Sequence, residues 1–256
     1  MLTDEYLARF GGIGRLYGRD QLIKFSKAHV LIVGLGGVGS WLAESLARTG
    51  VGALTLVDLD DLCVTNINRQ VHALNSTVGQ FKVEVMEKRL LDINPELKIN
   101  LKSCYFSEKS LNDIFDTNYD YVVDACDDFT NKSLMIDHCY HHHIPLITIG
   151  AAGGKTDPTQ IRVSDLTETQ NDKMLARIKK KLRKEKAFPQ EGKFNIWCVF
   201  SHERARYPGE DGCPTFQAPG HAKYLNCDEG FGSSSFVTGT FAFVASSHII
   251  DQLSKR

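Results

Sequence analysis

This sequence of 256 residues lacks paired cysteines: its seven cysteines form no CxxC pair and no CxxC…HxxxH spacing. Closed structural zinc sites are usually built from such pairs, so we expect none here, and Cys198 with His202 is the one remaining candidate pair. The cysteine count is odd and no signal peptide is recognisable. Both features predict a reducing, cytoplasmic environment in which disulfides do not form.

The sequence also has no excess of charge and no long apolar run. Its formal net charge is -1, so the overall charge indicates no particular partner, and we predict no DNA binding. The longest apolar stretch, residues 236–250, is short for a membrane span and contains Ser, Thr and His. Although its hydropathy resembles that of a transmembrane segment, we predict a buried helix there.

What the first half of the sequence does contain is a regular alternation of two patterns. Short apolar, β-branched runs predict buried strands at residues 29–33, 53–57, 97–102, 119–123 and 145–149. Helical periodicity lies between them at residues 39–49, 80–93 and 129–141. Strands that alternate with helices indicate an α/β fold with a Rossmann-like, mostly parallel sheet and flanking helices.

The pattern becomes less regular after residue 150. We predict strands at residues 161–166 and 195–201, helices at 170–186 and 236–253, and a long Gly-, Pro- and Ser-rich loop at 203–235. Neither an internal repeat nor a linker is visible. The sequence therefore predicts one domain, with residues 1–27 as a helical N-terminal arm, 28–150 as the core and 151–256 as a C-terminal, substrate-binding elaboration.

A glycine-rich segment joins the first predicted strand to the first predicted helix. It contains Gly34, Gly36, Gly37, Gly39 and Ser40. Glycines let the backbone approach a phosphate closely, and the following helix offers free N–H groups and a positive dipole end. The segment therefore predicts nucleotide binding rather than a tight turn without a ligand, but it suits NAD as well as ATP.

Charged residues beyond the second predicted strand favour ATP. Asp58 ends that strand, where a carboxylate can hydrogen-bond ribose hydroxyls. Arg69 and Lys82 follow, and an enzyme that attacks the α-phosphate of ATP needs such cations because negative charge moves onto the leaving pyrophosphate. Asp127 follows the strand at 119–123 and is a candidate ligand for Mg²⁺. Each of these residues alone would more often be a surface charge, but the ordered set is much more specific.

These motifs resemble the ThiF family of adenylating enzymes, which includes ubiquitin-activating proteins, over residues 8–150. The matching residues are the glycine loop 34–40, Asp58, Asp60, Asn66, Arg69, Gln70, Lys82 and the segment Asp124-Ala-Cys-Asp127. The resemblance makes residues 28–150 an ATP-binding core. It also implies that Asp58 holds the ribose, that Asn66, Arg69 and Lys82 hold the triphosphate, and that Asp127 holds Mg²⁺. Family members form homodimers in which an N-terminal arginine enters the partner's site, and Arg15 matches that element.

A narrower resemblance covers almost the full length. Segments 9–18, 199–203 and 227–233 are similar to the branch that dehydrates threonylcarbamoyladenosine in tRNA, and the lack of CxxC pairs fits this branch better than the sulfur-carrier activators. The implied reaction joins the threonyl carboxylate to AMP and then closes a cyclic hydantoin. A cysteine desulfurase or sulfur-acceptor system is a further partner that this branch suggests.

Two features outside the ATP motifs bear on the substrate. Cys227 is a candidate for covalent catalysis, because related activators use a cysteine in their C-terminal half, but a loop cysteine without a covalent role is equally compatible. Residues 173–186 contain eight basic residues and one acidic residue. We interpret this helix as a contact for tRNA phosphates rather than as a solvated face.

Three other functions remain open from the sequence. An activator of a ubiquitin-like or sulfur-carrier protein would use the same ATP site for a C-terminal glycine carboxylate. An NAD dehydrogenase would use the glycine loop but has no clear need for Arg69 and Lys82. An inactive scaffold for a sulfur-transfer partner would not need the complete set of charged residues.

Overall fold

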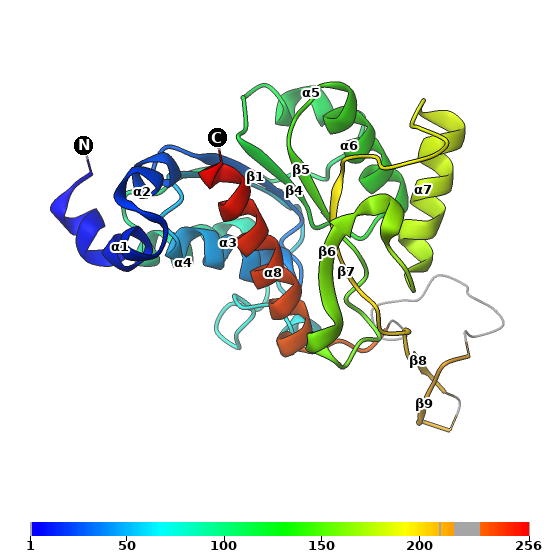
Figure 1. Ribbon diagram of the computed structural model, residues 1–256. Coiled ribbons are helices and arrows are strands. Elements are labelled where there is room, and N and C mark those ends of the chain that lie inside the picture. Colours follow the sequence, from blue (N-terminus) through cyan, green and yellow to red (C-terminus); the bar gives the residue numbers. More distant parts are fainter. Residues whose placement is uncertain (1, 210, 218–230, 256) are drawn as a thin grey trace.

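The computed structural model describes residues 2–209, 211–217 and 231–255, in which a seven-stranded sheet has the order β3-β2-β1-β4-β5-β7-β6 (Figure 1). Its strands are β1 (His29–Val33), β2 (Ala53–Val57), β3 (Lys98–Lys102), β4 (Tyr121–Asp124), β5 (Leu146–Ile149), β6 (Ile161–Asp165) and β7 (Trp197–Ser201). All neighbouring pairs are parallel except β6 with β7. This confirms the predicted mostly parallel α/β fold, to which a small ribbon of β8 (Tyr207–Pro208) and β9 (Pro214–Thr215) is added.

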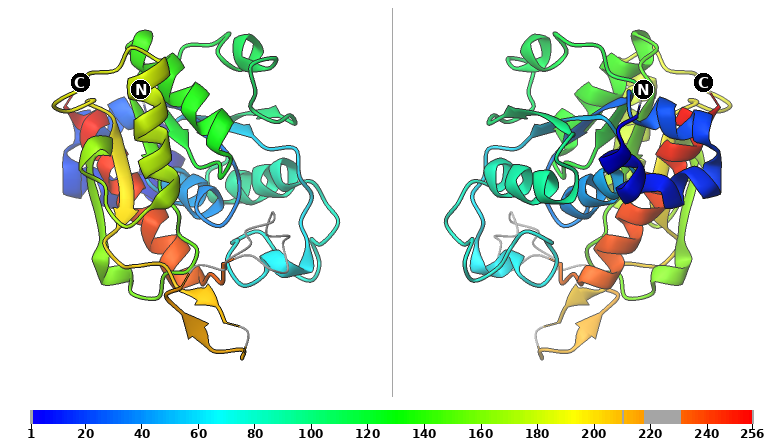
Figure 2. Two further views of the ribbon diagram at one scale, coloured as in Figure 1. Left: turned by 90° about the vertical axis from the view of Figure 1, so that its right-hand side faces the viewer. Right: turned by 90° about the vertical axis from the view of Figure 1, so that its left-hand side faces the viewer.

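Helices cover both faces of the sheet (Figures 1 and 2). They are α1 (Asp4–Tyr17), α2 (Arg19–Phe25), α3 (Gly39–Arg48), α4 (Lys82–Ile93), α5 (Leu111–Ile114), α6 (Phe129–His141), α7 (Lys173–Glu185) and α8 (Ser235–Ser254). Single 3-10 turns lie at Val64–Asn66, Pro158–Gln160 and Leu166–Glu168. No helix among the described residues is long and apolar enough to cross a membrane.

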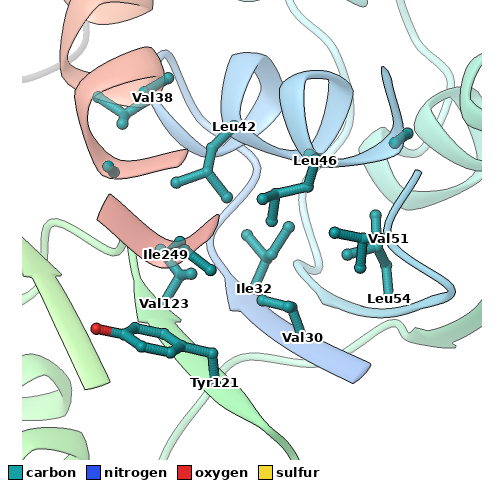
Figure 3. Packing of buried hydrophobic residues seen from close by; sticks show 14 of the residues in the cluster. Val30, Ile32, Val38, Leu42, Leu46, Val51, Leu54, Tyr121, Val123 and Ile249 are labelled. Atoms are coloured by element: carbon teal, nitrogen blue, oxygen red, sulfur yellow. The ribbon is translucent and has the colours of Figure 1, made fainter. Parts of the chain in front are cut away.

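Strand β1 contributes to a separate apolar core on each face of the sheet. Val30 and Ile32 pack with residues of α3, α4 and α8, as Figure 3 shows for part of this core. Leu31 and Val33 point the other way, into a core formed with α6 and α7. Successive side chains of a strand alternate between faces, so a strand covered on both sides must be apolar throughout. This explains why the strand appears in the sequence as an uninterrupted apolar run.

The chain order reverses between β1 and β4. From β1 the sheet continues through β2 and β3 on one side and through β4 and β5 on the other. In open α/β sheets such a reversal leaves a crevice at the carboxyl ends of the two central strands, where ligands bind. The glycine loop after β1 and the segment after β4 therefore lie at the position expected of a nucleotide site.

The sequence-based boundaries needed some corrections. The N-terminal arm consists of two helices, which are separated at Gly18 with φ 97°. The strand predicted at 119–123 begins at Tyr121, the first residue that pairs with β1, and the Tyr119 hydroxyl donates to the carbonyl of Ile114 at 2.6 Å. Helix α5 and the ribbon β8–β9 were not predicted. The assignment of the three sequence regions to one domain stays a prediction.

Candidate functional site

Two glycines of the loop after β1 are required by the protein's own backbone. A Cβ on Gly34, which has φ 92°, would lie 2.9 Å from the carbonyl oxygen of Ala125, and a Cβ on Gly39 would lie 1.8 Å from that of Gly34. The loop thus packs directly against the segment after β4. Gly36 differs, because no described atom lies within 4 Å of the position that its Cβ would take. The open side of the loop at Gly36 is where a phosphate could approach the backbone.

Asp58 connects the glycine loop to the end of β2. Its Oδ2 accepts from the backbone N–H of Leu35 at 2.7 Å, and its Oδ1 accepts from that of Asp60 at 2.9 Å. Burial raises the pKa of Asp58, and the nearby Lys82 and the two backbone donors offset only part of this rise. The predicted ribose ligand therefore also fixes the loop, and each oxygen can still accept another hydrogen bond from a hydroxyl.

Lys82 lies buried beside this carboxylate at the first residue of α4. Its Nζ is 2.7 Å from Oδ2 of Asp60 and 3.7 Å from Oδ1 of Asp58. The Tyr105 hydroxyl donates to the other oxygen of Asp60 at 2.8 Å. Partial burial alone would raise the pKa of Asp60, but the hydrogen bonds from Lys82 and Tyr105 hold it below its usual range. An ammonium has three donors, so Lys82 can contact a phosphate without leaving Asp60.

Arg69 lies against the glycine loop. A Cβ on Gly37 would be 3.3 Å from Cγ of Arg69. The Arg69 carbonyl accepts from Nε1 of Trp41 at 3.0 Å and from the Thr238 hydroxyl at 3.3 Å, which fixes its backbone between α3 and α8. Its Nη1 donates to the Thr65 carbonyl at 2.6 Å. A guanidinium has five N–H donors, so it retains the capacity to bind a phosphate as well.

Asn66 and Ser40 make local contacts in this structure. The Asn66 Oδ1 accepts from the backbone N–H of Cys63 at 3.0 Å and so caps the 3-10 turn that precedes Arg69. Ser40 is fully buried, and its Oγ accepts from the backbone N–H of Val71 at 3.4 Å. Both residues thereby position the segment that carries Arg69. The triphosphate contact implied for Asn66 stays a prediction.

Asp127 lies exposed in the segment between β4 and α6. This segment packs on the glycine loop at Gly34, so the carboxylate lies at the same edge of the sheet as the other candidate residues. Within the described ranges, no group of three or more His, Cys, Asp or Glu side chains could hold a metal ion. An exposed carboxylate nevertheless fits Mg²⁺, which usually takes one or two protein carboxylates and completes its shell with substrate phosphates and water.

Arg15 lies on a helix that packs at the end of α3 remote from the glycine loop. Helix α1 packs on the carboxyl end of α3, where the Tyr6 hydroxyl donates to the carbonyl of Gly50. The glycine loop lies at the other end of α3, whose ten residues span about 15 Å. Arg15 is exposed in the last turn of α1. Cys227 lies outside the described residues. The Asn68 Nδ2 donates to the carbonyl of Ser233 at 2.9 Å and so joins the start of α8 to the Arg69 segment.

A comparison with known families identifies the family of this chain. A model of the ThiF family matches residues 12–256. The chain belongs to the ThiF family. This confirms the resemblance that the glycine loop and the charged residues after it indicated.

Two relatives of this ThiF-family protein match it over nearly their whole length. The tRNA threonylcarbamoyladenosine dehydratase of Haemophilus influenzae is 46% identical, over 99% of this chain and 96% of its own. The enzyme of the same name from Escherichia coli is 43% identical over the same shares. A crystal structure of the E. coli dehydratase in complex with ATP superposes with a TM-score of 0.88, at 42% identity and with 99% and 96% of the two chains covered.

In this ThiF-family protein, a buried ion pair lies next to the segment that carries Asp127, and it was not predicted from the sequence. Lys132 Nζ lies 2.8 Å from Oδ2 of Asp124, and neither side chain is exposed. The hydroxyl of Thr148 donates to the same oxygen at 2.6 Å, and Cys126 Sγ donates to Oδ1 at 2.8 Å. Although full burial opposes its charge, Asp124 raises the pKa of Lys132. The available signal was a lysine on the apolar side of α6, near Met135.

Proposed function

We propose that this protein is an ATP-dependent tRNA threonylcarbamoyladenosine dehydratase. The observation that carries the proposal is the match, over nearly its full length, to an enzyme of that name crystallised with ATP. The local geometry supports it, because a glycine loop, a buried lysine and an arginine converge at the carboxyl edge of the sheet. A sulfur-carrier activator is not favoured, since the two dehydratases from H. influenzae and E. coli match this chain from end to end.

The reaction has two steps under this proposal. First, a threonyl carboxylate oxygen attacks the α-phosphate of ATP, and the bond to pyrophosphate breaks. Lys82 and Arg69 stabilise the charge that develops on the phosphates, while Asp58 holds the ribose. When bound, Mg²⁺ on Asp127 supplies further neutralisation of phosphate charge.

The second step closes a ring. A carbamoyl nitrogen of the same nucleoside attacks the activated carbonyl carbon and loses its proton, and AMP leaves with the electron pair of the C–O bond. The product is a cyclic hydantoin, and one water is lost overall from the nucleoside. Because nucleophile and electrophile belong to one molecule, closure gains effective concentration and needs positioning rather than a protein nucleophile. Cys227 is therefore proposed only as a residue to test.

One experiment tests the function directly. The protein is incubated with ATP, Mg²⁺ and tRNA that carries threonylcarbamoyladenosine, and the digested nucleosides are weighed by mass spectrometry. We expect the modified nucleoside to lose the mass of one water and AMP to form in equal amount. An unchanged nucleoside would refute the proposal. Pyrophosphate exchange that a carrier protein stimulates and tRNA does not would support the activator instead.

Asp127→Ala should raise the Mg²⁺ concentration needed for half-maximal adenylation by about tenfold, because the ion then has one protein ligand fewer. The measurement is AMP formation titrated with Mg²⁺ at saturating ATP. Asp128→Asn is the matched control, since it removes a neighbouring charge while an asparagine can still accept the cap bond that Asp128 takes from the N–H of Asn131. An unchanged Mg²⁺ requirement in Asp127→Ala would show that this carboxylate is not the ligand.

The proposed homodimer places Arg15 in the partner's site, which is consistent with the packing of α1 at the end of α3 remote from the glycine loop. Arg15→Ala and Lys82→Ala chains, each inactive alone, should then recover roughly a quarter of the wild-type activity when mixed equally, because half of the dimers carry one intact site of two. Activity is measured after subunit exchange that native mass spectrometry has verified. If verified heterodimers stay inactive, Arg15 acts within its own chain or has no role.

A further inference from the structure

Helix α7 turns two different faces to its surroundings. Leu175, Ile178 and Leu182 are fully buried in the core shared with α6. The opposite face carries cations that recur every three or four residues and therefore form one row along the helix, which we call the basic row. The basic row consists of Lys173, Arg177, Lys180, Lys181 and Lys184.

Other cations of the same helix are held by the protein itself. The Nζ of Lys179 donates to the carbonyl of Thr169 at 2.8 Å, and partial burial lowers its pKa. The Arg183 Nε donates to the carbonyl of Pro189 at 3.4 Å, and its guanidinium lies 5.1 Å from the ring centre of Phe194. Neither residue belongs to the outward-facing row. The structure thus distinguishes between basic residues that the sequence presents as a single cluster.

An aromatic ring lies beside the basic row. Phe129 is partly buried, with the Arg177 guanidinium carbon 4.6 Å and the Lys181 Nζ 5.1 Å from its ring centre. Together these side chains form a hollow of about 460 Å³, which is lined by Phe129, Arg177, Lys180, Lys181, Lys184 and Glu185. One acidic side chain among four basic ones leaves the hollow strongly positive.

One residue that lines the hollow closely follows the segment that carries Asp127. Phe129 is the first residue of α6 and stands two positions after Asp127. Helix α7 also begins at the carboxyl edge of the sheet, where Oδ2 of its cap residue Asp172 accepts from the N–H of Ala151, two residues beyond β5. The two helices lie side by side (Figures 1 and 2). A strand of nucleic acid lying along the basic row would therefore lead directly to the segment that carries Asp127.

We propose that Phe129 and the basic row form a docking site for a single-stranded loop of the RNA substrate. Bases that are free of a duplex stack on aromatic rings and arginine planes, whereas their phosphates pair with cations. The hollow provides both elements, with Phe129 and Arg177 for a base and Lys180 and Lys184 for phosphates. This inference rests on the proposed function for the identity of the substrate, but RNA binding can be measured without turnover.

The test measures binding of an unmodified tRNA transcript by fluorescence anisotropy at several salt concentrations. Phe129→Leu keeps an apolar side chain but removes the ring, and should weaken binding roughly 5- to 150-fold, as the loss of base stacking usually does, with an unchanged salt slope. Phe129→Tyr should restore binding. The double variant Lys180→Gln/Lys184→Gln should flatten the slope of log affinity against log salt by roughly 0.7–0.9 for each phosphate that it no longer neutralises.

Lys98→Gln is the matched control for the lysine substitutions. Lys98 is exposed on β3, which forms one edge of the sheet, whereas β6 and β7, the strands that precede and follow α7 in the chain, lie at the other edge. It should leave affinity and slope unchanged. Both lysines of the double variant lie on the outer face of α7, so the double variant should fold normally even if Phe129→Leu were unstable. Unchanged transcript binding in Phe129→Leu and in the double variant would overturn the docking site. If the wild type binds RNA through this surface but dehydrates no modified tRNA, the proposed function fails while the docking site stands.

Discussion

Replacing Lys82 by alanine should slow AMP formation roughly 10²–10⁴-fold, because it removes a buried cation that faces developing phosphate charge. Arg69→Ala should have an effect of similar size for the same reason. The structure places both residues at the glycine loop, with Lys82 held by Asp60 and the Arg69 backbone held by Trp41. The measurement is ATP–pyrophosphate exchange and single-turnover AMP release.

Lys82→Ala also removes the cation that pairs with Asp60, which keeps only its hydrogen bond from Tyr105, and this second effect requires a control. The double variant Lys82→Ala/Asp60→Asn removes the stranded negative charge but does not restore the cation. If weaker stabilisation of the phosphates is the cause, the double variant should stay as slow as Lys82→Ala. Recovery in the double variant would show that Lys82 acts only by neutralising Asp60. Near-normal rates in both Lys82→Ala and Arg69→Ala would contradict the adenylation site.

Lys132→Met should lower the free energy of unfolding by about 3–5 kcal/mol, because it leaves the Asp124 carboxylate buried without its counter-charge. Neither side chain of the pair is exposed, so water cannot replace the missing partner. Denaturant unfolding monitored by circular dichroism gives the value. Lys132→Arg, which keeps the charge, should lose less stability.

The double variant Lys132→Met/Asp124→Leu distinguishes the effect of the two charges from the effect of the volume that the two side chains fill. Replacement of a buried ion pair by apolar residues of similar volume is often nearly neutral, so the double variant should be more stable than Lys132→Met. A double variant at least as unstable as Lys132→Met would mean that the loss comes from packing or from the Thr148 hydroxyl and Cys126 thiol, which no longer have Asp124 as acceptor, and not from an uncompensated charge. In that case the ion pair would not be what fixes the segment before Asp127.

The central strands could be predicted because burial on both faces leaves a direct mark on the sequence. Val30 to Val33 must all be apolar when a core lies on each side of the sheet. The edge strand β6 was found as a strand, but its antiparallel direction depends on pairing with β7, which no local pattern encodes. Helix α5 has only four residues and is too short to show periodicity.

The candidate site also contains some residues that could be predicted from the sequence and others that could not. Glycines and charged residues that follow a strand were predictable, because the carboxyl ends of parallel strands meet at one edge. Lys132 was missed because a lysine is rarely buried without a partner, and only the fold places Asp124 beside this one. The hydrogen bonds of Lys179 to backbone carbonyls likewise arise from the fold, so a count of basic residues could not separate it from Lys180.

The position of β7 in the sheet has a consequence for synthesis on the ribosome. Strand β5 ends at Ile149, but its outer neighbour β7 begins only at Trp197. The nascent chain therefore contains five strands before β7 has been synthesised. During this interval the hydrogen-bonding groups along one side of β5 are unpaired. An apolar strand with an open edge is prone to pair with other chains. We expect this interval to be the stage at which the nascent protein depends most on chaperones.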